Sequence, residues 1–338
     1  MACERRNAFF PRRAAAMLAA AGVAVAAAGG VAGAREKGGG PTVVVSIAPI
    51  HSLAAMAMAG VAEPRLLLPR GASPHGYALK PSDARALSRA DLVIWVGPQL
   101  ESFLVKPFAA LVAPENVLAL VTAPGVATRP ARHGGAWEDE AEAGPAAHPH
   151  DHRGHEPGEA GIDPHVWLDP VNGAAMVEAI AAALARLDAG NAGRYRANAR
   201  RAVRRIKDLG AALGARLATV RPIPYIVFHD AYAYFEARYR LRAVGSVVVG
   251  SDRRPGIKRV TEIRARLRRT GAVCVFAEPQ FSPAIAATVV EGTGARIGVL
   301  DPLGVGLAPG PDLYGSLLTR LATSLVGCLS GPSARPAP

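Results

Sequence analysis

The middle of the chain reads NAGRYRANARRAVRRIKDLGAALGARLATV, from Asn191 to Val220. This segment holds no proline, its apolar residues recur three and four positions apart, and arginine or lysine occupies the other face. The spacing predicts one long helix over residues 191–220. Because strand-forming runs lie on both sides of it, we expect this helix to join two lobes.

Short runs rich in β-branched residues lie on both sides of the predicted helix, with helical patterns between them. This alternation is typical of parallel sheets with crossover helices and predicts an α/β fold. We place an N-terminal lobe at residues 41–190, a C-terminal lobe at 221–330 and a disordered tail at 331–338. The predicted strands are 42–47, 65–68, 91–96 and 116–120 in the first lobe, and 225–228, 241–249, 272–276 and 296–300 in the second.

The amino terminus has the pattern of an export signal. Four arginines precede an apolar, alanine-rich run from Ala14 to Ala32, and small residues follow up to Ala34. We predict a signal peptide over residues 1–34, cleaved near Ala34, with Sec and twin-arginine export both open. A retained membrane anchor is the alternative. Cys3 lies before the apolar run, so it is not a lipobox cysteine.

Composition excludes several classes of protein. The chain has 338 residues with 50% hydrophobic content, which is enough for a sizeable buried core. A net charge of +12 would suit a nucleic-acid binder, but aromatic residues make up 5% of the chain and no recognition motif is present, so we expect no nucleic-acid partner. Three cysteines without a CxxC exclude a zinc ribbon and a thioredoxin-type redox site.

One segment, from Thr128 to Ile162, breaks the α/β pattern. It is rich in glycine, proline, alanine, acids and histidine and shows no apolar periodicity, so it predicts a disordered insertion in the N-terminal lobe. Five of the nine histidines of the chain lie in it, and we predict that they form an auxiliary, weak metal-binding loop: His133, His148, His150, His152 and His155.

Three of the other four histidines lie at positions where α/β proteins bind ligands. His75 follows a predicted strand, His229 comes directly after another, and His165 precedes a helix. Ligands of open α/β sheets bind at the carboxyl ends of strands. Nitrogen donors favour Zn²⁺, Cu²⁺ or Ni²⁺ over Mn²⁺ or Ca²⁺, so this pattern indicates a site for a divalent metal.

Several motifs around these histidines make a family recognisable. They are SPH at 73–75 with PSD at 81–83, ADLVIWVGP at 90–98, DPHVWLDP at 163–170, FHDAYAYF at 228–235, CVFAEPQF at 274–281 and LDPLG at 300–304. In this order the chain resembles the periplasmic zinc-binding proteins of bacterial zinc ABC importers, the ZnuA family, from about Val43 to Leu329.

The resemblance implies a fold, a site and a partner. It implies two α/β lobes joined by a long rigid helix, with Zn²⁺ bound in the interlobe cleft by His75, His165 and His229. It also implies a disulfide between Cys274 and Cys328, and a membrane permease of a zinc ABC importer as partner. We expect a monomer located in the periplasm.

One position departs from the family pattern. Some members carry glutamate directly before the first ligand histidine, where this chain has Pro74, which cannot bind a metal. The fourth ligand is then water or Asp301, which matches a carboxylate of related manganese and iron binders. Glu278 is predicted to orient a ligand histidine through its other ring nitrogen. His51, in the first turn after a strand, is predicted to be structural or on the surface.

The function predicted on this basis is high-affinity zinc capture for an importer, without catalysis. A manganese- or iron-binding member of the same group is the first alternative. A zinc hydrolase would need an open metal position with a base beside it, for which Asp301 or Glu278 would serve, but no HExxH motif is present. An additional role as a surface adhesin stays open, because related metal binders have been described in that way.

Overall fold

Two four-stranded parallel sheets form the framework of the protein, as the alternating pattern predicts. The computed structural model describes residues 40–132, 135, 137, 161–248 and 255–331. The predicted signal peptide, the five histidines of the insertion and residues 332–338 of the tail lie outside these described residues. No described helix is long and apolar enough to cross a membrane.

The N-terminal sheet has the strand order β2-β1-β3-β4, and all its pairs are parallel. Valine, isoleucine and leucine dominate its inner strands, and β1 and β3 are buried along their whole length because helices cover both faces. The strands are β1 (Val43–Val45), β2 (Arg65–Leu66), β3 (Leu92–Trp95) and β4 (Val117–Ala119), and the helices between them are α1 (Ala48–Met58), α2 (Pro81–Ser88) and α3 (Val105–Leu111).

The C-terminal sheet repeats this topology with the order β6-β5-β7-β8, again entirely parallel. Both sets of strands lie within the ranges that the sequence predicts, except that β7 extends one residue further. The strands are β5 (Tyr225–Val227), β6 (Ala243–Ser246), β7 (Cys274–Ala277) and β8 (Arg296–Val299), and the helices are α6 (Ala233–Tyr239), α7 (Ile257–Thr270), α8 (Pro283–Val290) and α9 (Leu313–Leu329).

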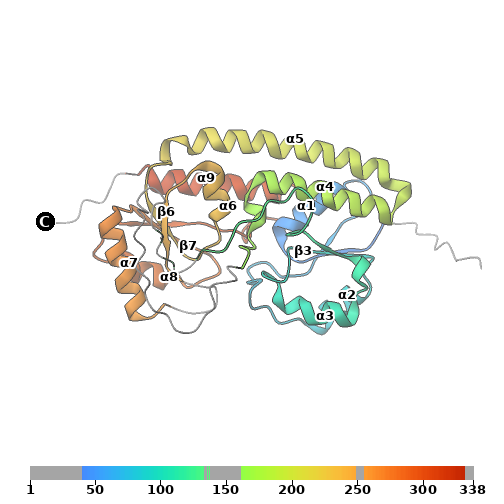
Figure 1. The fold of residues 1–338 in the computed structure, drawn as a ribbon, viewed down its shortest axis with the longest axis horizontal. Coiled ribbons are helices and arrows are strands. Elements are labelled where there is room, and N and C mark those ends of the chain that lie inside the picture. Colours follow the sequence, from blue (N-terminus) through green and yellow to red (C-terminus); the bar gives the residue numbers. More distant parts are fainter. Residues whose placement is uncertain (1–39, 133–134, 136, 138–160, 249–254, 332–338) are drawn as a thin grey trace, which may run out of the picture. The chain divides into compact units, whose positions relative to one another are not determined.

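A long helix joins the two lobes, as predicted from the central segment. It is α5 (Ala192–Leu217), with one 3₁₀ turn at each end, so that helical backbone extends from Ala189 to Val220. Its buried side chains recur at the predicted spacing and face α4 (Pro170–Leu187), α1 and α9. Figure 1 shows α5 running along both lobes, with α4 and α9 beneath it.

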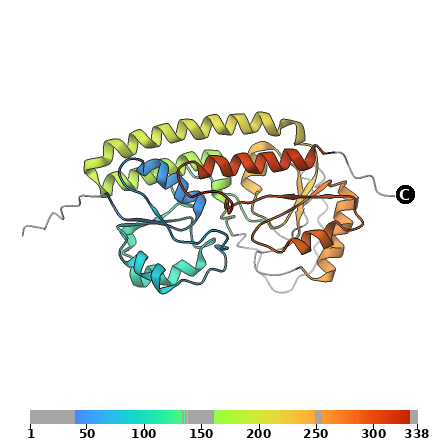
Figure 2. The same cartoon turned by 180° about the vertical axis from the view of Figure 1, so that it is seen from behind.

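The C-terminal helix also crosses between the lobes. Viewed from behind, α9 extends from the C-terminal sheet to α1 of the N-terminal lobe (Figure 2). Gly173 of α4 allows Tyr314 of α9 to pack close to the α4 backbone, because a Cβ atom at position 173 would lie 2.1 Å from the hydroxyl of Tyr314. One hydrophobic cluster therefore continues through both lobes.

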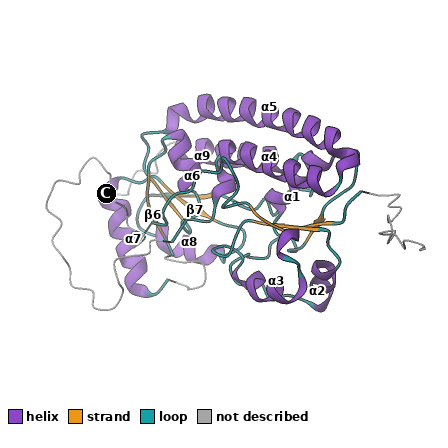
Figure 3. Ribbon diagram, turned by 45° about the vertical axis from the view of Figure 1, so that its right-hand side comes forward, coloured by secondary structure: helices purple, strands orange, loops and turns teal. Residues whose placement is uncertain are grey.

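The cysteine pair lies in the C-terminal lobe. Cys274 of β7 and Cys328 of α9 form a disulfide, which ties the sheet to the helix that crosses the lobes. The loops that leave the carboxyl ends of the strands face the region between the two sheets (Figure 3).

The ends of the predicted insertion differ from the expectation of a segment without packing from Thr128 onward. Pro130 and Ile162 form an antiparallel bridge, and the main-chain N–H of Ala131 donates to the carbonyl of Gly161 at 2.7 Å. The composition of the segment conceals this pairing because its apolar residues are few and far apart in sequence. The structured lobe therefore includes both ends of the segment.

Candidate metal centre

His229 is fixed by a carboxylate of its own lobe. It lies two residues after β5, and its Nδ1 is 2.6 Å from Oε1 of Glu278, the residue that follows β7. Both side chains are buried. A histidine whose Nδ1–H is donated to a carboxylate presents Nε2 to a metal, so Nε2 is the ligand atom that this residue offers.

His165 is fixed in the same way by a residue two positions before it. The Oδ1 atom of Asp163 lies 2.8 Å from Nδ1 of His165 and also accepts the main-chain N–H of His165 at 3.0 Å. His165 precedes a 3₁₀ turn, Val166–Leu168, which leads into α4. This local turn again leaves Nε2 free to bind a metal.

The segment that carries His165 is held mainly by the C-terminal lobe. The indole N–H of Trp167 donates to the carbonyl of Pro302 at 2.9 Å, and the hydroxyl of Tyr314 donates to the carbonyl of Trp167 at 2.8 Å. Arg238 of α6 forms two hydrogen bonds to Asp169, the residue before α4, at 2.8 and 2.7 Å. His165 is thus connected to the lobe that carries His229.

His75 is held less firmly. It lies in the loop after β2, and its main-chain N–H donates to the hydroxyl of Ser73 at 3.3 Å. Its ring has no hydrogen-bond partner among the described residues, in contrast to the rings of His165 and His229. The main chain rather than a carboxylate therefore positions this imidazole.

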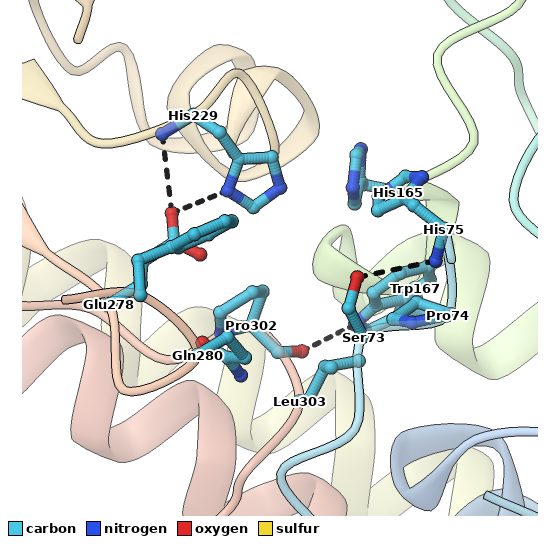
Figure 4. Close-up of a pocket in the computed structure, with 11 residues that line it drawn as sticks. Ser73, Pro74, His75, His165, Trp167, His229, Glu278, Gln280, Pro302 and Leu303 are labelled. Carbon is cyan, nitrogen blue, oxygen red and sulfur yellow. Dashed lines mark hydrogen bonds and ion pairs between the residues drawn. The ribbon is translucent and has the colours of Figure 1, made fainter. Parts of the chain in front are cut away.

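These three histidines converge although they are far apart in sequence. Each offers a ligand atom, and these atoms all lie within 4.8 Å of one another. The ring centroids are 5.5, 6.1 and 5.3 Å apart for the pairs 75–165, 75–229 and 165–229. Figure 4 shows the three rings pointing toward one point. Tetrahedral Zn²⁺ with 2.0–2.1 Å bonds places nitrogens about 3.3 Å apart, so a small inward movement completes the site.

A small cavity lies beside the three histidines. Its volume of about 20 Å³ admits an ion or a water molecule but no organic solute. Trp167, Phe281 and Leu303 contribute apolar walls to it. Such walls limit the access of solvent to the three imidazoles.

Burial and charge act differently on the histidines of the two lobes. Burial, together with the neighbouring His165 and His229, lowers the pKa of His75 to about 3. For His229 burial also favours the neutral ring, but the charge and the hydrogen bond of Glu278 prevail and raise its pKa. The two rings are therefore shifted in opposite directions, His75 toward the neutral form and His229 toward the protonated form.

Asp301 does not join the cluster. Its Oδ1 accepts the main-chain N–H groups of Leu303 and Gly304 at 3.0 Å each, and its Oδ2 accepts that of Val305 at 2.6 Å. It also accepts a hydrogen bond from Gln280 at 3.2 Å. Four donors thus hold this carboxylate in the turn after β8, and of the two predicted fourth ligands, water and Asp301, the carboxylate is engaged by its own turn.

The other predicted residues are also located. Glu278 contacts His229, as expected of a residue that orients a ligand. His51 is buried in α1, where its Nε2 lies 2.8 Å from the carbonyl of Pro64, and burial lowers its pKa. His51 is therefore structural.

Sequence reasoning missed Asp163 as the partner of His165. Its signal was the DPH spacing, in which an aspartate two residues before a histidine can close a turn onto it. Tyr234 and Tyr314, which hold the same segment from the other lobe, had no sequence signal because their contacts span 71 and 147 residues of chain.

Comparison with known proteins points to one family. The family model of the zinc-uptake complex component A, periplasmic (ZnuA), matches residues 43–328. A protein of Brucella suis biovar 1 (strain 1330), named high-affinity zinc uptake system protein ZnuA, is 42% identical over 305 residues, covering 85% of this chain and 91% of that protein. A Yersinia pestis protein of the same name is 41% identical over 293 residues, with the same coverage. A crystal structure of ZnuA superposes with a TM-score of 0.69 at 23% identity, covering 86% of this chain and 99% of the other, and supports the fold.

Proposed function

Because the chain belongs to the ZnuA family of periplasmic zinc-uptake components, we propose that it captures Zn²⁺ and delivers it to the membrane permease of an ABC importer. The observation that carries this proposal is the convergence of three imidazoles, from separate segments, beside a cavity of the size of an ion or a water molecule. Zinc is the cargo of this site.

We assign the zinc ligands to Nε2 of His165 and His229 and to one ring nitrogen of His75. Asp163 and Glu278 orient two of these rings and raise their basicity, as outer carboxylates do in zinc sites. The fourth position belongs to a water molecule, because Pro74 offers no donor and Asp301 is held by the backbone of its own turn. An all-nitrogen set of protein ligands favours Zn²⁺ over Mn²⁺.

Location and partner follow from the same family. We place the mature protein in the periplasm after cleavage near Ala34, as a monomer that meets the permease with zinc bound. The proposed lobes are residues 41–190 and 221–330, with the linking helix at 191–220 between them. We propose no catalytic activity. An esterase and phosphatase assay on the zinc-loaded protein tests this statement, and zinc-dependent turnover that disappears in His229→Ala would contradict it.

Metal content is the direct test of the function. The purified protein is stripped with a chelator, exposed to equal concentrations of Zn²⁺, Mn²⁺ and Fe²⁺, and analysed for bound metal. We expect one tight equivalent of Zn²⁺ that survives dialysis. Preferential retention of Mn²⁺ or Fe²⁺ would establish the alternative cargo, and failure to retain any metal would refute the proposal.

The predicted auxiliary loop is tested separately. We propose that the five histidines between 133 and 155 gather zinc weakly, since their spacing in an acid-rich segment suits transient binding. Isothermal titration of zinc into the full chain should detect more than one equivalent, and deletion of residues 133–155 should leave a single tight one. Loss of the tight equivalent would place the principal site in the insertion instead.

A further inference from the structure

A two-stranded ribbon connects the root of the insertion to the metal centre. We define it as residues 129–132 and 161–163. The bridge between Pro130 and Ile162 closes it, and the N–H of Asp163 donates to the carbonyl of Arg129 at 2.9 Å. The ribbon therefore ends at the residue whose carboxylate orients His165.

This ribbon is bound to the C-terminal lobe. The hydroxyl of Tyr234, in α6, accepts the N–H of Arg129 and donates to the carbonyl of Asp163, both at 2.8 Å. Just beyond the ribbon, the N–H of Ser246 donates to Gly135 at 2.8 Å, at the edge strand β6. A chain segment that leaves the N-terminal sheet is thus fixed to the opposite lobe.

Arg132 makes the strongest of these connections. Its Nε lies 3.0 Å from each carboxylate oxygen of Asp230, its terminal nitrogen also bonds that carboxylate, and another terminal nitrogen lies 2.8 Å from Oε2 of Glu236. The guanidinium carbon stacks 3.5 Å from the centre of the Trp137 ring. Asp230 directly follows His229, and Glu236 is a buried residue of α6.

The surroundings of Arg132 make the contact costly to lose. Its side chain is 27% exposed, and those of Asp230 and Glu236 are 21% and 5% exposed. Removal of this cation leaves two partly desolvated carboxylates without its compensation. Lysine does not replace it fully, because an ammonium cannot bind one carboxylate through two nitrogens and a second through a third.

We propose that Arg132 is a positioning residue of the metal centre, which clamps the ribbon leading to His165 onto the segment that carries His229. The inference rests on the proposed zinc-binding function. Two imidazoles from opposite segments must be held at a defined separation before the ion arrives, and each contact that fixes them in advance removes an ordering cost from binding. Arg132 supplies this preorganisation from outside the ligand set.

The test compares Arg132→Gln and Arg132→Lys with the unaltered protein. Zinc affinity is measured by competition with a chromogenic chelator, and site geometry by the visible absorption spectrum of bound Co²⁺. We expect Arg132→Gln to weaken zinc binding at least fivefold and to alter the Co²⁺ spectrum, and Arg132→Lys to recover part of both. Arg205→Gln removes an exposed ion pair with Asp312, remote from the histidines, and serves as the matched control without effect.

Thermal unfolding of the metal-free variants separates positioning from general stability. If Arg132→Gln lowers the melting temperature but keeps the zinc affinity and the Co²⁺ spectrum of the unaltered protein, the proposal is refuted. If Arg132→Gln does not fold, Arg132→Lys alone decides by the same two measurements. In a double-mutant cycle, the effects of Arg132→Gln and Asp230→Asn on zinc affinity should be non-additive, because both changes break the same contact. Additive effects would refute the clamp.

Failure of the underlying function gives a different result. If the unaltered protein binds no zinc, the proposed function fails at its own control and the inference falls with it. If the unaltered protein binds zinc tightly and His229→Ala does not, the function stands, and the Arg132 variants then test the clamp alone.

Discussion

The two lobes share one topology, but the crevice at the carboxyl ends of their central strands holds different contacts in each lobe. In each sheet the first strand in sequence, β1 or β5, lies between its two neighbours, which creates a crevice at the carboxyl ends of β1 and β3 or of β5 and β7. A buried glutamate occupies both crevices, Glu101 in the first lobe and Glu278 in the second.

The partners of the two glutamates differ. Glu101 accepts hydrogen bonds from the hydroxyl of Ser46 at 2.5 Å and from the N–H groups of Val96 and Gly97 at 3.2 and 2.9 Å. Glu278 faces His229, and its Oε2 atom accepts no hydrogen bond within the part of the chain that the structure describes. In the N-terminal lobe a fully hydrogen-bonded carboxylate fills the crevice. In the C-terminal lobe the carboxylate orients His229, the proposed metal ligand. The residue that the glutamate meets after the central strand is a serine in one lobe and a histidine in the other.

Of the changes that test this difference between the lobes, removal of a ligand histidine should have the largest effect on zinc affinity. We expect His229→Ala, and equally His75→Ala or His165→Ala, to weaken zinc binding about a hundredfold or more, because loss of an outer partner alone costs about 10- to 100-fold in zinc sites. Chelator competition measures the affinity. His51→Ala, a buried histidine outside the cluster, is the control, and an equal loss in that variant would refute the ligand assignment.

The two glutamates should give reciprocal results when each is changed to glutamine. Glu278→Gln should weaken zinc binding roughly tenfold with a small change in stability, because it loses the carboxylate that orients His229. Glu101→Gln should keep the zinc affinity but lower the free energy of unfolding by about 2 kcal/mol, since its amide N–H₂ would face a main-chain donor. Chelator competition and urea unfolding of both variants measure the two effects. Equal losses of affinity would contradict the division of roles.

The pH dependence of zinc binding should reflect the C-terminal lobe rather than the N-terminal one. The pKa of His229 is raised above its usual 6.5, whereas that of His75 is lowered to about 3. Below the pKa of His229, zinc must displace one proton from this ring, so affinity should fall about tenfold per pH unit as pH decreases. Titrations between pH 5.5 and 8 measure the slope. A zinc affinity that does not change over this pH range would contradict the assignment of His229 as the titrating ligand.

The smallest predicted effect concerns the stability of the N-terminal lobe. Burial raises the pKa of Glu101 to about 7, against the hydrogen bonds to Gly97, Ser46 and Val96, which lower it. The folded state then binds more protons than the unfolded state between about pH 4.5 and 7, so the contribution of Glu101 to stability decreases as pH rises, by about 1 kcal/mol between pH 5 and 6. Urea unfolding at these two pH values should show this difference for the unaltered protein but not for Glu101→Gln. Identical pH dependence in both proteins would refute the assignment.

Much of the fold could be predicted because its signals are local. The strands around Val43–Val45 and Leu92–Trp95 are continuous apolar runs, and the long helix repeats its apolar positions over 26 residues. The three central histidines could be singled out because each lies in a loop beside a strand or a helix. Their convergence was implied by family resemblance, since spacing alone does not bring positions 75, 165 and 229 together.

The two alternatives for the fourth ligand, water and Asp301, could not be separated from the sequence for a physical reason. A carboxylate at the end of a strand has the same sequence signature whether it turns toward a cation or accepts hydrogen bonds from its own turn. Here the three N–H groups of residues 303–305 hold it. The ends of the insertion were mispredicted for a similar reason, because a ribbon closed by Pro130 and Ile162 leaves no periodic pattern in either strand.

The sequence by itself determined the α/β class, the linking helix and the histidines that can bind a metal, because each depends on residue type and on contacts within a few turns of chain. Only the tertiary structure decided how those histidines are held. Asp163 and Glu278 orient two rings, whereas the third has no hydrogen-bond partner among the described residues. Contacts from Tyr314, Tyr234 and Arg132 join the segment of His165 to the other lobe. These contacts span from 71 to 147 residues of chain, and packing of the two lobes rather than local preference brings them together.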